Sequence, residues 1–267
     1  MDEQHITKDA VLTILGSCAG TEPIPGKHHT SITIECGGKL YWFDAGESCS
    51  YTAHLRKINL LSTEAIFISH THMDHIGGLP NLLWTLRKLM TRSPEVRNAM
   101  KDRAIDVFIP DLEVWDGILK LLAGTEGGFR IPFQLNAQRY ENGLVYRGDG
   151  IKVLAHHNKH LDVSPPLSFS FRIEVGTTRI VFSGDVTHIS DCDPLLDDCD
   201  ILLMETGHHK VEDICQWLVE SSKRIGRLVF VHHGRAILAD PEKELRKARS
   251  IMGENVSLAY DGMTIQL

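Results

Sequence analysis

Short apolar runs separated by turn residues dominate the chain. Residues 11–15 read Val-Leu-Thr-Ile-Leu before Gly16, and residues 31–35 alternate apolar and polar side chains before a Gly-Gly pair. Runs rich in β-branched and aromatic residues that end at glycine or proline are typical of strands. The same criteria predict strands at 40–43, 66–68, 105–109, 151–155, 167–175, 178–182, 201–204 and 228–231, and strand-like segments within 256–266.

Four other segments carry apolar residues at helical spacing. In residues 79–90, Leu82, Leu83, Leu86 and Leu89 recur at intervals of three and four, which places them on one helix face. Both halves of the chain pass from strands to helices, a progression that favours an α/β (α+β) fold of two sheets with helices outside them. We find no linker and expect one domain over 1–267. The other predicted helices are 112–122, 211–222 and 241–252.

The composition is that of an ordinary globular protein. The 267 residues are 42% hydrophobic and 24% charged, enough to bury a sizeable core. A net charge of −7 argues against a strongly basic nucleic-acid surface. No apolar run approaches the ~20 residues of a membrane span, and residues 1–5 are polar, unlike a secretory signal. We therefore expect a cytoplasmic protein without a membrane partner, whose six scattered cysteines are reduced thiols.

The densest cluster of ligand-type side chains is the run 70–75, which reads His-Thr-His-Met-Asp-His directly after the strand predicted at 66–68. Neutral imidazoles and carboxylates are the ligands of zinc, and they also suit iron and manganese. Loops at strand ends are common places for such ligands. We interpret the run as a metal-binding loop.

Four further ligand-type residues follow predicted strands: Asp44, His160, Asp185 and His232. Any one of them alone would more often be a turn residue or a hydrogen-bonded structural histidine. Their recurrence at successive strand ends, in a chain that also carries the run 70–75, favours a single metal centre.

These residues, in this order, resemble the five motifs of the metallo-β-lactamase superfamily, and the N-terminal portion is most similar to ribonuclease Z. The resemblance implies an αββα four-layer sandwich and a homodimer. The matching segments are Leu15-Gly16-Ser17-x-Ala19-Gly20, Phe43-Asp44-x-Gly46-Glu47, His70-x-His72-x-Asp74-His75, Val153-x-Ala155-x-x-x-x-His160, Phe169-x-Phe171-Arg172-Ile173, and the isolated residues Asp185 and His232.

Carried over residue by residue, the resemblance implies two divalent metal ions, with zinc favoured and manganese or iron as alternatives. Asp44 would orient a ligand histidine without binding metal itself. His156 and His157 are alternatives to His160, and His233 is an alternative to His232. The implied ligands are His70, His72 and His160 for the first metal, Asp74, His75 and His232 for the second, and Asp185 as the bridge.

The resemblance also implies hydrolytic chemistry. Two cations that share a water lower its pKa and supply a bridging hydroxide, whose proton Asp74 would orient or accept. In ribonuclease Z a His-Glu pair protonates the leaving oxygen. Glu205 matches the glutamate, but Met204 stands where the histidine should be. His208 and His209 are therefore the candidates for the proton donor.

A second departure concerns the substrate. Ribonuclease Z carries a long arm for tRNA between the ligand histidine and the bridging aspartate, but here residues 167–182 of that interval are needed for two strands. We therefore predict a ribonuclease Z-like phosphodiesterase that acts on a small or nucleotide phosphodiester, and we disfavour tRNA as a substrate. The basic series Arg87, Lys88, Arg92, Arg97, Lys101 and Arg103 is interpreted as a solvated helix face and loop rather than as phosphate contacts.

Other classes of function stay open as alternatives. They are a true tRNA 3′-processing endoribonuclease, a lactone or thioester hydrolase on the same metals, an oxygen-handling iron site like that of flavodiiron proteins, and a non-catalytic binding module. The last two are disfavoured, because the residue after Asp74 is a histidine, no flavin domain follows, and the ligand set is complete.

Overall fold

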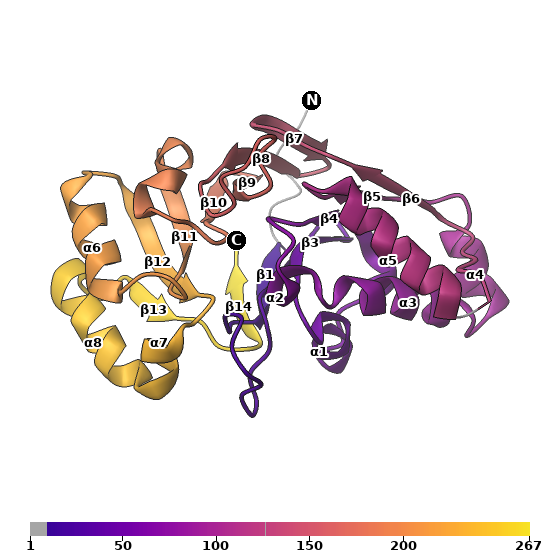
Figure 1. The fold of residues 1–267 in the computed structure, drawn as a ribbon, viewed down its shortest axis with the longest axis horizontal. Coiled ribbons are helices and arrows are strands. Elements are labelled where there is room, and N and C mark those ends of the chain that lie inside the picture. Colours follow the sequence, from indigo (N-terminus) through magenta and orange to yellow (C-terminus); the bar gives the residue numbers. More distant parts are fainter. Residues whose placement is uncertain (1–9, 126) are drawn as a thin grey trace.

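The computed structural model describes residues 10–125 and 127–267, so the polar N-terminus interpreted above lies outside the described residues. Two seven-stranded sheets face each other, with helices on both outer sides (Figure 1). The first sheet has the order β14 (Met263–Gln266), β1 (Val11–Gly16), β2 (Ser31–Cys36), β3 (Lys39–Ala45), β4 (Thr63–Phe67), β5 (Ala104–Phe108) and β6 (Gln134–Gln138). The second has the order β13 (Val256–Leu258), β12 (Ile225–Val231), β11 (Cys199–Glu205), β10 (Thr178–Phe182), β9 (Phe169–Val175), β8 (Ile151–His157) and β7 (Gly143–Gly148).

Both sheets follow one pairing pattern. In the first, β14, β1, β2 and β3 pair antiparallel and β3 to β6 pair parallel. In the second, β7 to β10 pair antiparallel and β10 to β13 pair parallel. The carboxyl ends of parallel strands share one edge of a sheet, which is where open α/β sheets place their binding loops.

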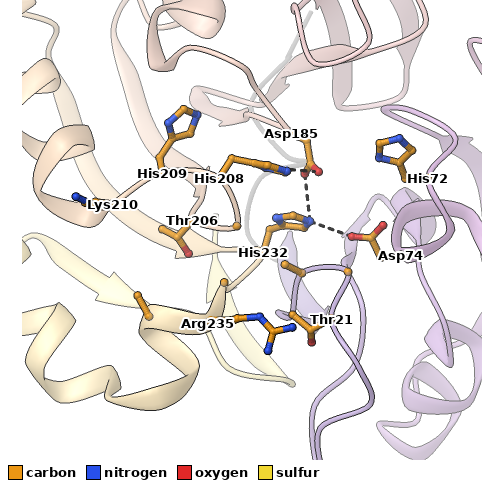
Figure 2. Close-up of a pocket in the computed structure, with 15 residues that line it drawn as sticks. Thr21, His72, Asp74, Asp185, Thr206, His208, His209, Lys210, His232 and Arg235 are labelled. Carbon is orange, nitrogen blue, oxygen red and sulfur yellow. Dashed lines mark hydrogen bonds and ion pairs between the residues drawn. The ribbon is translucent and has the colours of Figure 1, made fainter.

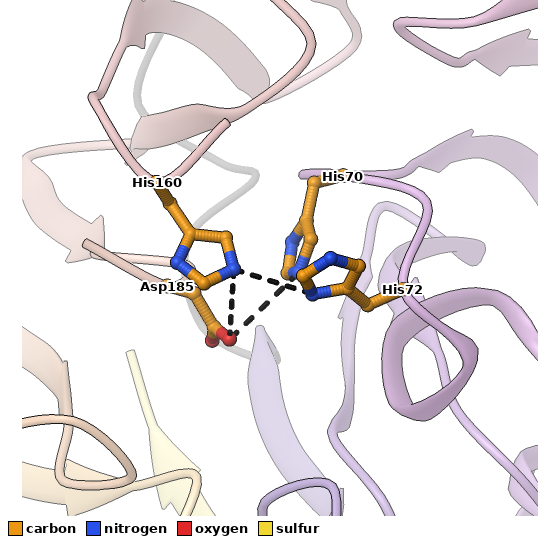
Figure 3. A group of neighbouring side chains, drawn as sticks. All are labelled: His70, His72, His160 and Asp185. Carbon is orange, nitrogen blue, oxygen red and sulfur yellow. Dashed lines mark hydrogen bonds and ion pairs between the residues drawn. The ribbon is translucent and has the colours of Figure 1, made fainter. Parts of the chain in front are cut away.

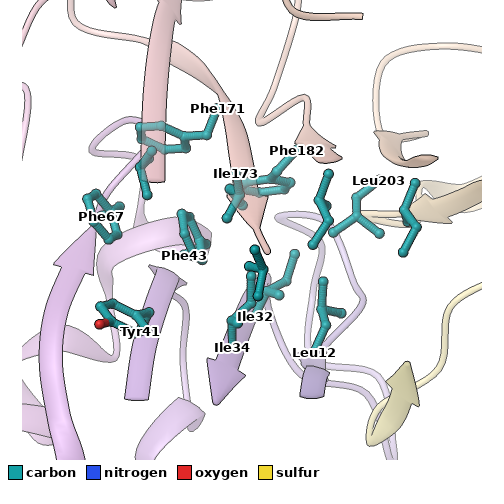
Figure 4. Packing of buried hydrophobic residues seen from close by; sticks show 14 of the residues in the cluster. Leu12, Ile32, Ile34, Tyr41, Phe43, Phe67, Phe171, Ile173, Phe182 and Leu203 are labelled. Carbon is teal, nitrogen blue, oxygen red and sulfur yellow. The ribbon is translucent and has the colours of Figure 1, made fainter. Parts of the chain in front are cut away.

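The core lies between the sheets and is rich in aromatic side chains (Figure 4). Successive residues of a strand point to opposite faces, so Tyr41 and Phe43 of β3 enter this core while Leu40 and Trp42 pack under the helices. Phe43 stacks on Phe67 at 5.0 Å between ring centroids. Burial on both faces explains why the run 40–43 is continuously apolar.

The helices cover the two outer faces. The apolar side of α3 (Leu79–Met90) packs with that of α5 (Leu112–Thr125) on the first sheet. On the second sheet, α6 (Val211–Glu220) and α8 (Pro241–Met252) take the same place. The smaller elements are α1 (Cys49–Leu55), η2 (Leu60–Ser62), α2 (Met73–Ile76), α4 (Pro94–Met100), η3 (Ile189–Leu195) and α7 (Arg235–Ala239).

The prediction of two sheets between outer helices is confirmed, with local differences. Strands β6 and β7 were not predicted, because neither carries a fully buried residue. The sequence of β7 lacks alternation, and β6 alternates with only two apolar side chains, Leu135 and Ala137. The run 70–75 is a loop only as far as His72, since residues 73–76 form helix α2. Asp44 lies inside β3, which continues to Ala45. Among the described residues, no helix has the length and apolar character needed to cross a bilayer.

Candidate metal centre

Loops from both sheets bring the seven predicted ligand side chains together. His70 and His72 follow β4, and Asp74 and His75 lie on α2. The second sheet contributes the other three, each from the segment that follows a strand: His160 after β8, Asp185 after β10 and His232 after β12. Two groups of potential ligands contain Asp185, and a third group, formed by Glu205, His208 and His232, shares His232 with the second.

The first group consists of His70, His72, His160 and Asp185 (Figure 3). Nε2 of His160 lies 3.2 Å from Nδ1 of His72. Oδ2 of Asp185 lies 3.7 Å from Nε2 of His70 and 3.8 Å from Nε2 of His160. Three imidazoles and one carboxylate thus surround one point.

The second group consists of Asp74, His75, His232 and again Asp185. Oδ1 of Asp185 lies 3.2 Å from Nε2 of His75 and 3.3 Å from Nε2 of His232. Oδ2 of Asp74 lies 3.0 Å from the same His232 nitrogen (Figure 2). The two groups therefore face different oxygens of one carboxylate, the arrangement needed for a bridging ligand.

The donor atoms fit divalent metal ions. Ligands about 2.0–2.1 Å from a tetrahedral zinc lie about 3.3 Å apart, close to the separations in both groups. Three buried donor atoms of the site, His70 Nε2, His75 Nε2 and Asp185 Oδ1, have no hydrogen-bond partner among the described residues. Buried polar atoms are seldom left unpaired without a reason, and a cation is the partner that suits these three.

A buried carboxylate beneath the site sets the orientation of two ligand histidines. Asp44 accepts hydrogen bonds from the Ser69 amide at 2.7 Å, the Ser69 hydroxyl at 2.8 Å and Nδ1 of His75 at 2.6 Å. Because its hydroxyl donates to Asp44, Ser69 can accept from Nδ1 of His70 at 3.1 Å. Both imidazoles are thereby held with the Nε2 lone pair towards the metal groups. Asp44 has φ 59°, a left-handed conformation that aspartate tolerates better than most residues.

The carboxylates of the site shift the pKa values of the histidines beside them. Burial opposes the charged form of His75, but Asp185 and Asp44 raise its pKa well above the usual value. Burial likewise opposes the charged form of His232, but Asp185 and Asp74 raise its pKa to about 9. Burial would raise the pKa of Asp185, but the neighbouring imidazoles hold it well below the usual range. A divalent cation would replace these protons.

The histidines that competed for ligand positions lie elsewhere. Nδ1 of His157 bonds Asn142, and neither His157 nor His156 belongs to a metal-binding group among the described residues. His233 is buried, with Nε2 donating to the carbonyl of Ala259 at 2.8 Å. These three are structural or surface histidines.

The two candidates for the proton donor, His208 and His209, have different hydrogen-bond partners. Nδ1 of His208 donates to Oε1 of Glu205 at 3.0 Å, and the same nitrogen lies 3.9 Å from Asp185. Nε2 of His209 instead donates to the carbonyl of Val186 at 2.9 Å. Glu205 is fully buried, whereas the His208 side chain is 43% exposed. His208 thus faces the open side of the site with a carboxylate behind it.

A pocket of about 510 Å³ opens beside both metal groups (Figure 2). Its lining includes two cationic side chains that the sequence analysis missed, Lys210 and Arg235. The Arg235 guanidinium forms a double hydrogen bond with the carboxylate of Glu22, at 3.0 and 2.9 Å. Lys210 and Arg235 each lie within three residues of a predicted site histidine. This proximity in the sequence is the signal by which they could have been predicted.

Two glycines lie against site residues where a side chain would not fit. A Cβ on Gly20 would lie 2.9 Å from Cγ of Asp74. A Cβ on Gly207 would lie 2.6 Å from Nδ1 of His232. Gly20 is the last residue of the segment 15–20 that matches ribonuclease Z. Its close approach to Asp74 is a steric reason for a glycine at this position.

Comparison with known proteins identifies the family. Residues 10–247 match the family described as anti-Pycsar protein Apyc1. The chain belongs to the Apyc1 family. One relative is the ribonuclease Z of Mycobacterium marinum. It is 25% identical to this chain over 279 residues, and the alignment covers 94% of this chain and 96% of that protein.

Solved structures show the same fold as this Apyc1 family member. The metallo-β-lactamase fold protein YhfI from Bacillus subtilis has a TM-score of 0.73 at 14% identity and covers 96% of this chain and 99% of its own. A diphosphatase of the PhnP family has a TM-score of 0.67 at 17% identity, covering 97% and 98%. The predictions of a ribonuclease Z-like member of the metallo-β-lactamase superfamily and of a metal-dependent hydrolase are confirmed.

Proposed function

We propose that this chain is a phosphodiesterase that uses two divalent metal ions, with zinc favoured, to hydrolyse a small or nucleotide phosphodiester. The observation that carries the proposal is the sharing of Asp185, whose two oxygens face two separate groups of ligands. The cation Lys210 lines the adjoining pocket and suits an anionic substrate.

The residues divide the chemistry between them. Divalent cations bound here would lower the pKa of a water and neutralise charge on a phosphate. Asp74 lines the pocket and is the carboxylate placed to accept a proton from the attacking water. Burial would raise the pKa of Asp74, but hydrogen bonds from His232 and His75 hold it below the usual range, so it is ionised.

We assign the proton donor for the leaving oxygen to His208. It lines the pocket, and Glu205 fixes its Nδ1 so that Nε2 is the nitrogen left to act. His209 is engaged through Nε2 with a backbone carbonyl, which suits an anchoring role. Glu205 is then a positioning residue.

The size of the site favours a small substrate. A volume of about 510 Å³ lies within the range of small-molecule pockets. Between His160 and Asp185 the chain forms β9, β10 and short loops, with no arm to hold tRNA. The relatives are named as a ribonuclease and a diphosphatase, and both names imply phosphate chemistry. We propose that this chain acts in the anti-Pycsar role for which the family is named.

We also propose that residues 1–267 form one hydrolase domain, since the family match covers 10–247 and both sheets enclose one core. We also propose a cytoplasmic location. The six cysteines of the chain are free and buried, and thiols remain reduced in the cytoplasm.

A substrate panel on the zinc-reconstituted chain tests the proposal. It comprises bis(p-nitrophenyl) phosphate, cyclic and linear nucleotide phosphodiesters, precursor tRNA, a lactone and a thioester. Metal-dependent hydrolysis of the small phosphodiesters is expected. Turnover of the lactone or thioester alone would overturn the phosphodiesterase assignment, and preference for precursor tRNA would overturn the small substrate.

Replacement of the two histidines tests the proton donor. His208→Gln should lower kcat about 100-fold or more for a substrate with an alkoxide leaving group, and much less for a p-nitrophenolate leaving group that needs no proton. His209→Gln is the matched control. Equal losses in both variants, or a loss that ignores the leaving group, would show that His208 is not the donor.

A further inference from the structure

A second pocket lies at the end of the molecule that α3, α4 and α5 form, opposite the end formed by α6 and α8 (Figure 1). Its volume of about 480 Å³ is close to that of the metal-centre pocket, and the two share no lining residue. The C-terminal end of α3, the start of α4 and the segment before β6 enclose it.

Positive charge distinguishes this second pocket. Four of its nine lining residues are arginines from three separate segments, and no lining residue is acidic: Arg87, Arg92, Arg97 and Arg130. We call it the arginine pocket. Some arginines of the chain pair with carboxylates, as Arg103 does with Glu64. For Arg92, Arg97 and Arg130, no ion pair is found among residues 10–125 and 127–267.

The geometry of the arginine pocket is partly preset. Nε of Arg87 donates to the carbonyl of Arg130 at 3.3 Å, which holds the segment before β6 against α3. Met90, which is 3% exposed, and Pro132 supply an apolar part of the lining. Arg92, Arg97 and Arg130 are exposed, so an anion with more than one charge can interact with several of these cations at once.

We propose that the arginine pocket binds a small ligand that carries two or more phosphate groups, such as a nucleoside diphosphate. Guanidinium groups bind phosphate oxygens through paired hydrogen bonds, and several of them match several phosphates. A single carboxylate would neutralise only one. The apolar lining and the volume suit the nucleoside. The inference is independent of the chemistry at the metal centre.

Titration calorimetry of the metal-loaded full chain with ADP, with magnesium in excess, tests the proposal. The double variant Arg92→Ala/Arg97→Ala should lose a binding event or bind about tenfold or more weakly, since each hydrogen bond to a charged group contributes that much. The matched control is Arg246→Ala/Arg249→Ala, which removes the same charge from exposed positions on α8. Equal weakening in pocket and control variants would overturn the site.

Further ligands and variants separate the alternatives. Adenosine should not bind and AMP should bind more weakly than ADP. A short single-stranded oligonucleotide whose binding depends on the pocket, without any binding of ADP, would overturn a nucleotide site in favour of a nucleic-acid surface. Arg92→Lys/Arg97→Lys keeps the charge but loses the planar fork, so binding equal to wild type would refute paired guanidinium contacts. Hydrolysis of bis(p-nitrophenyl) phosphate should be unchanged in all pocket variants.

Discussion

Replacing Asp44 with asparagine should weaken metal binding while leaving the protein folded. Asparagine tolerates the left-handed backbone at this position, but its NH₂ group donates where a carboxylate oxygen accepted. If that NH₂ faces His75, Nδ1 can no longer donate and the imidazole loses the tautomer that directs a lone pair at the metal. If it faces the Ser69 amide instead, a buried donor loses its acceptor, and His75 still loses its charged partner.

The expected magnitudes follow from these contacts. Loss of a residue that orients a ligand typically lowers metal affinity about 10- to 100-fold, or about 1.4–2.7 kcal/mol. One buried donor without an acceptor lowers the free energy of unfolding by about 1–3 kcal/mol, less than the about 5–15 kcal/mol of a typical protein. Asp44→Ala would strand all three donors at once, so the asparagine variant is the informative one.

Asp261 offers a closely matched control. Its carboxylate accepts from the amide and hydroxyl of Ser17 and from the amide and Nδ1 of His28, a similar set of partners outside the metal groups. Asp261→Asn should lower the free energy of unfolding to a similar extent without changing the affinity for zinc.

The assay is competition for zinc against a chromophoric chelator, with denaturant unfolding of the metal-free proteins alongside. Zinc affinity in Asp44→Asn equal to that of wild type would refute the orienting role. So would an equal loss of affinity in Asp261→Asn, because the effect would then be a general consequence of lower stability.

Three further outcomes are expected. Asp185→Ala should lose both metal equivalents and activity, because each ligand group faces one of its oxygens; metal analysis that finds one equivalent retained would contradict the bridge. Zinc binding near pH 7 should release protons, since His75 and His232 are protonated in the metal-free site, and the release from His232 should fade above its pKa of about 9. Calorimetric heats that do not vary with buffer would contradict this. Cys49 and Cys192, whose pKa burial raises to about 12, should resist Ellman's reagent until guanidinium unfolds the chain; rapid reaction in the native state would contradict their burial.

The local pattern of apolar and polar residues was sufficient to predict much of the fold. The predicted helices 79–90 and 241–252 coincide with α3 and α8, because one apolar face of each packs on a sheet. The ligand-type residues were recognisable because they follow buried strands, whose apolar runs are easily read.

Contacts between distant segments account for what was missed. Strand β6 pairs at the edge of the first sheet with no fully buried residue, and its alternation consists of only two apolar side chains, Leu135 and Ala137. Ser69 gained its role only through Asp44, on a neighbouring strand. The choice between His208 and His209 depended on which acceptor lay within reach of each ring, the Glu205 carboxylate for His208 and the Val186 carbonyl for His209, and spacing along the chain does not determine this.

The pairing of β14 with β1 has a consequence for how the protein is made. Val11 to Ile14 of β1 pair with residues 263–266 of β14, so β1 has one unpaired edge until residues 263–266 have been synthesised. Asp261, in the turn before β14, then binds Ser17 and His28. Non-local pairing of this kind slows folding and exposes a strand edge to aggregation. The N-terminal half of this protein therefore completes its sheet only after the C-terminal half has been translated.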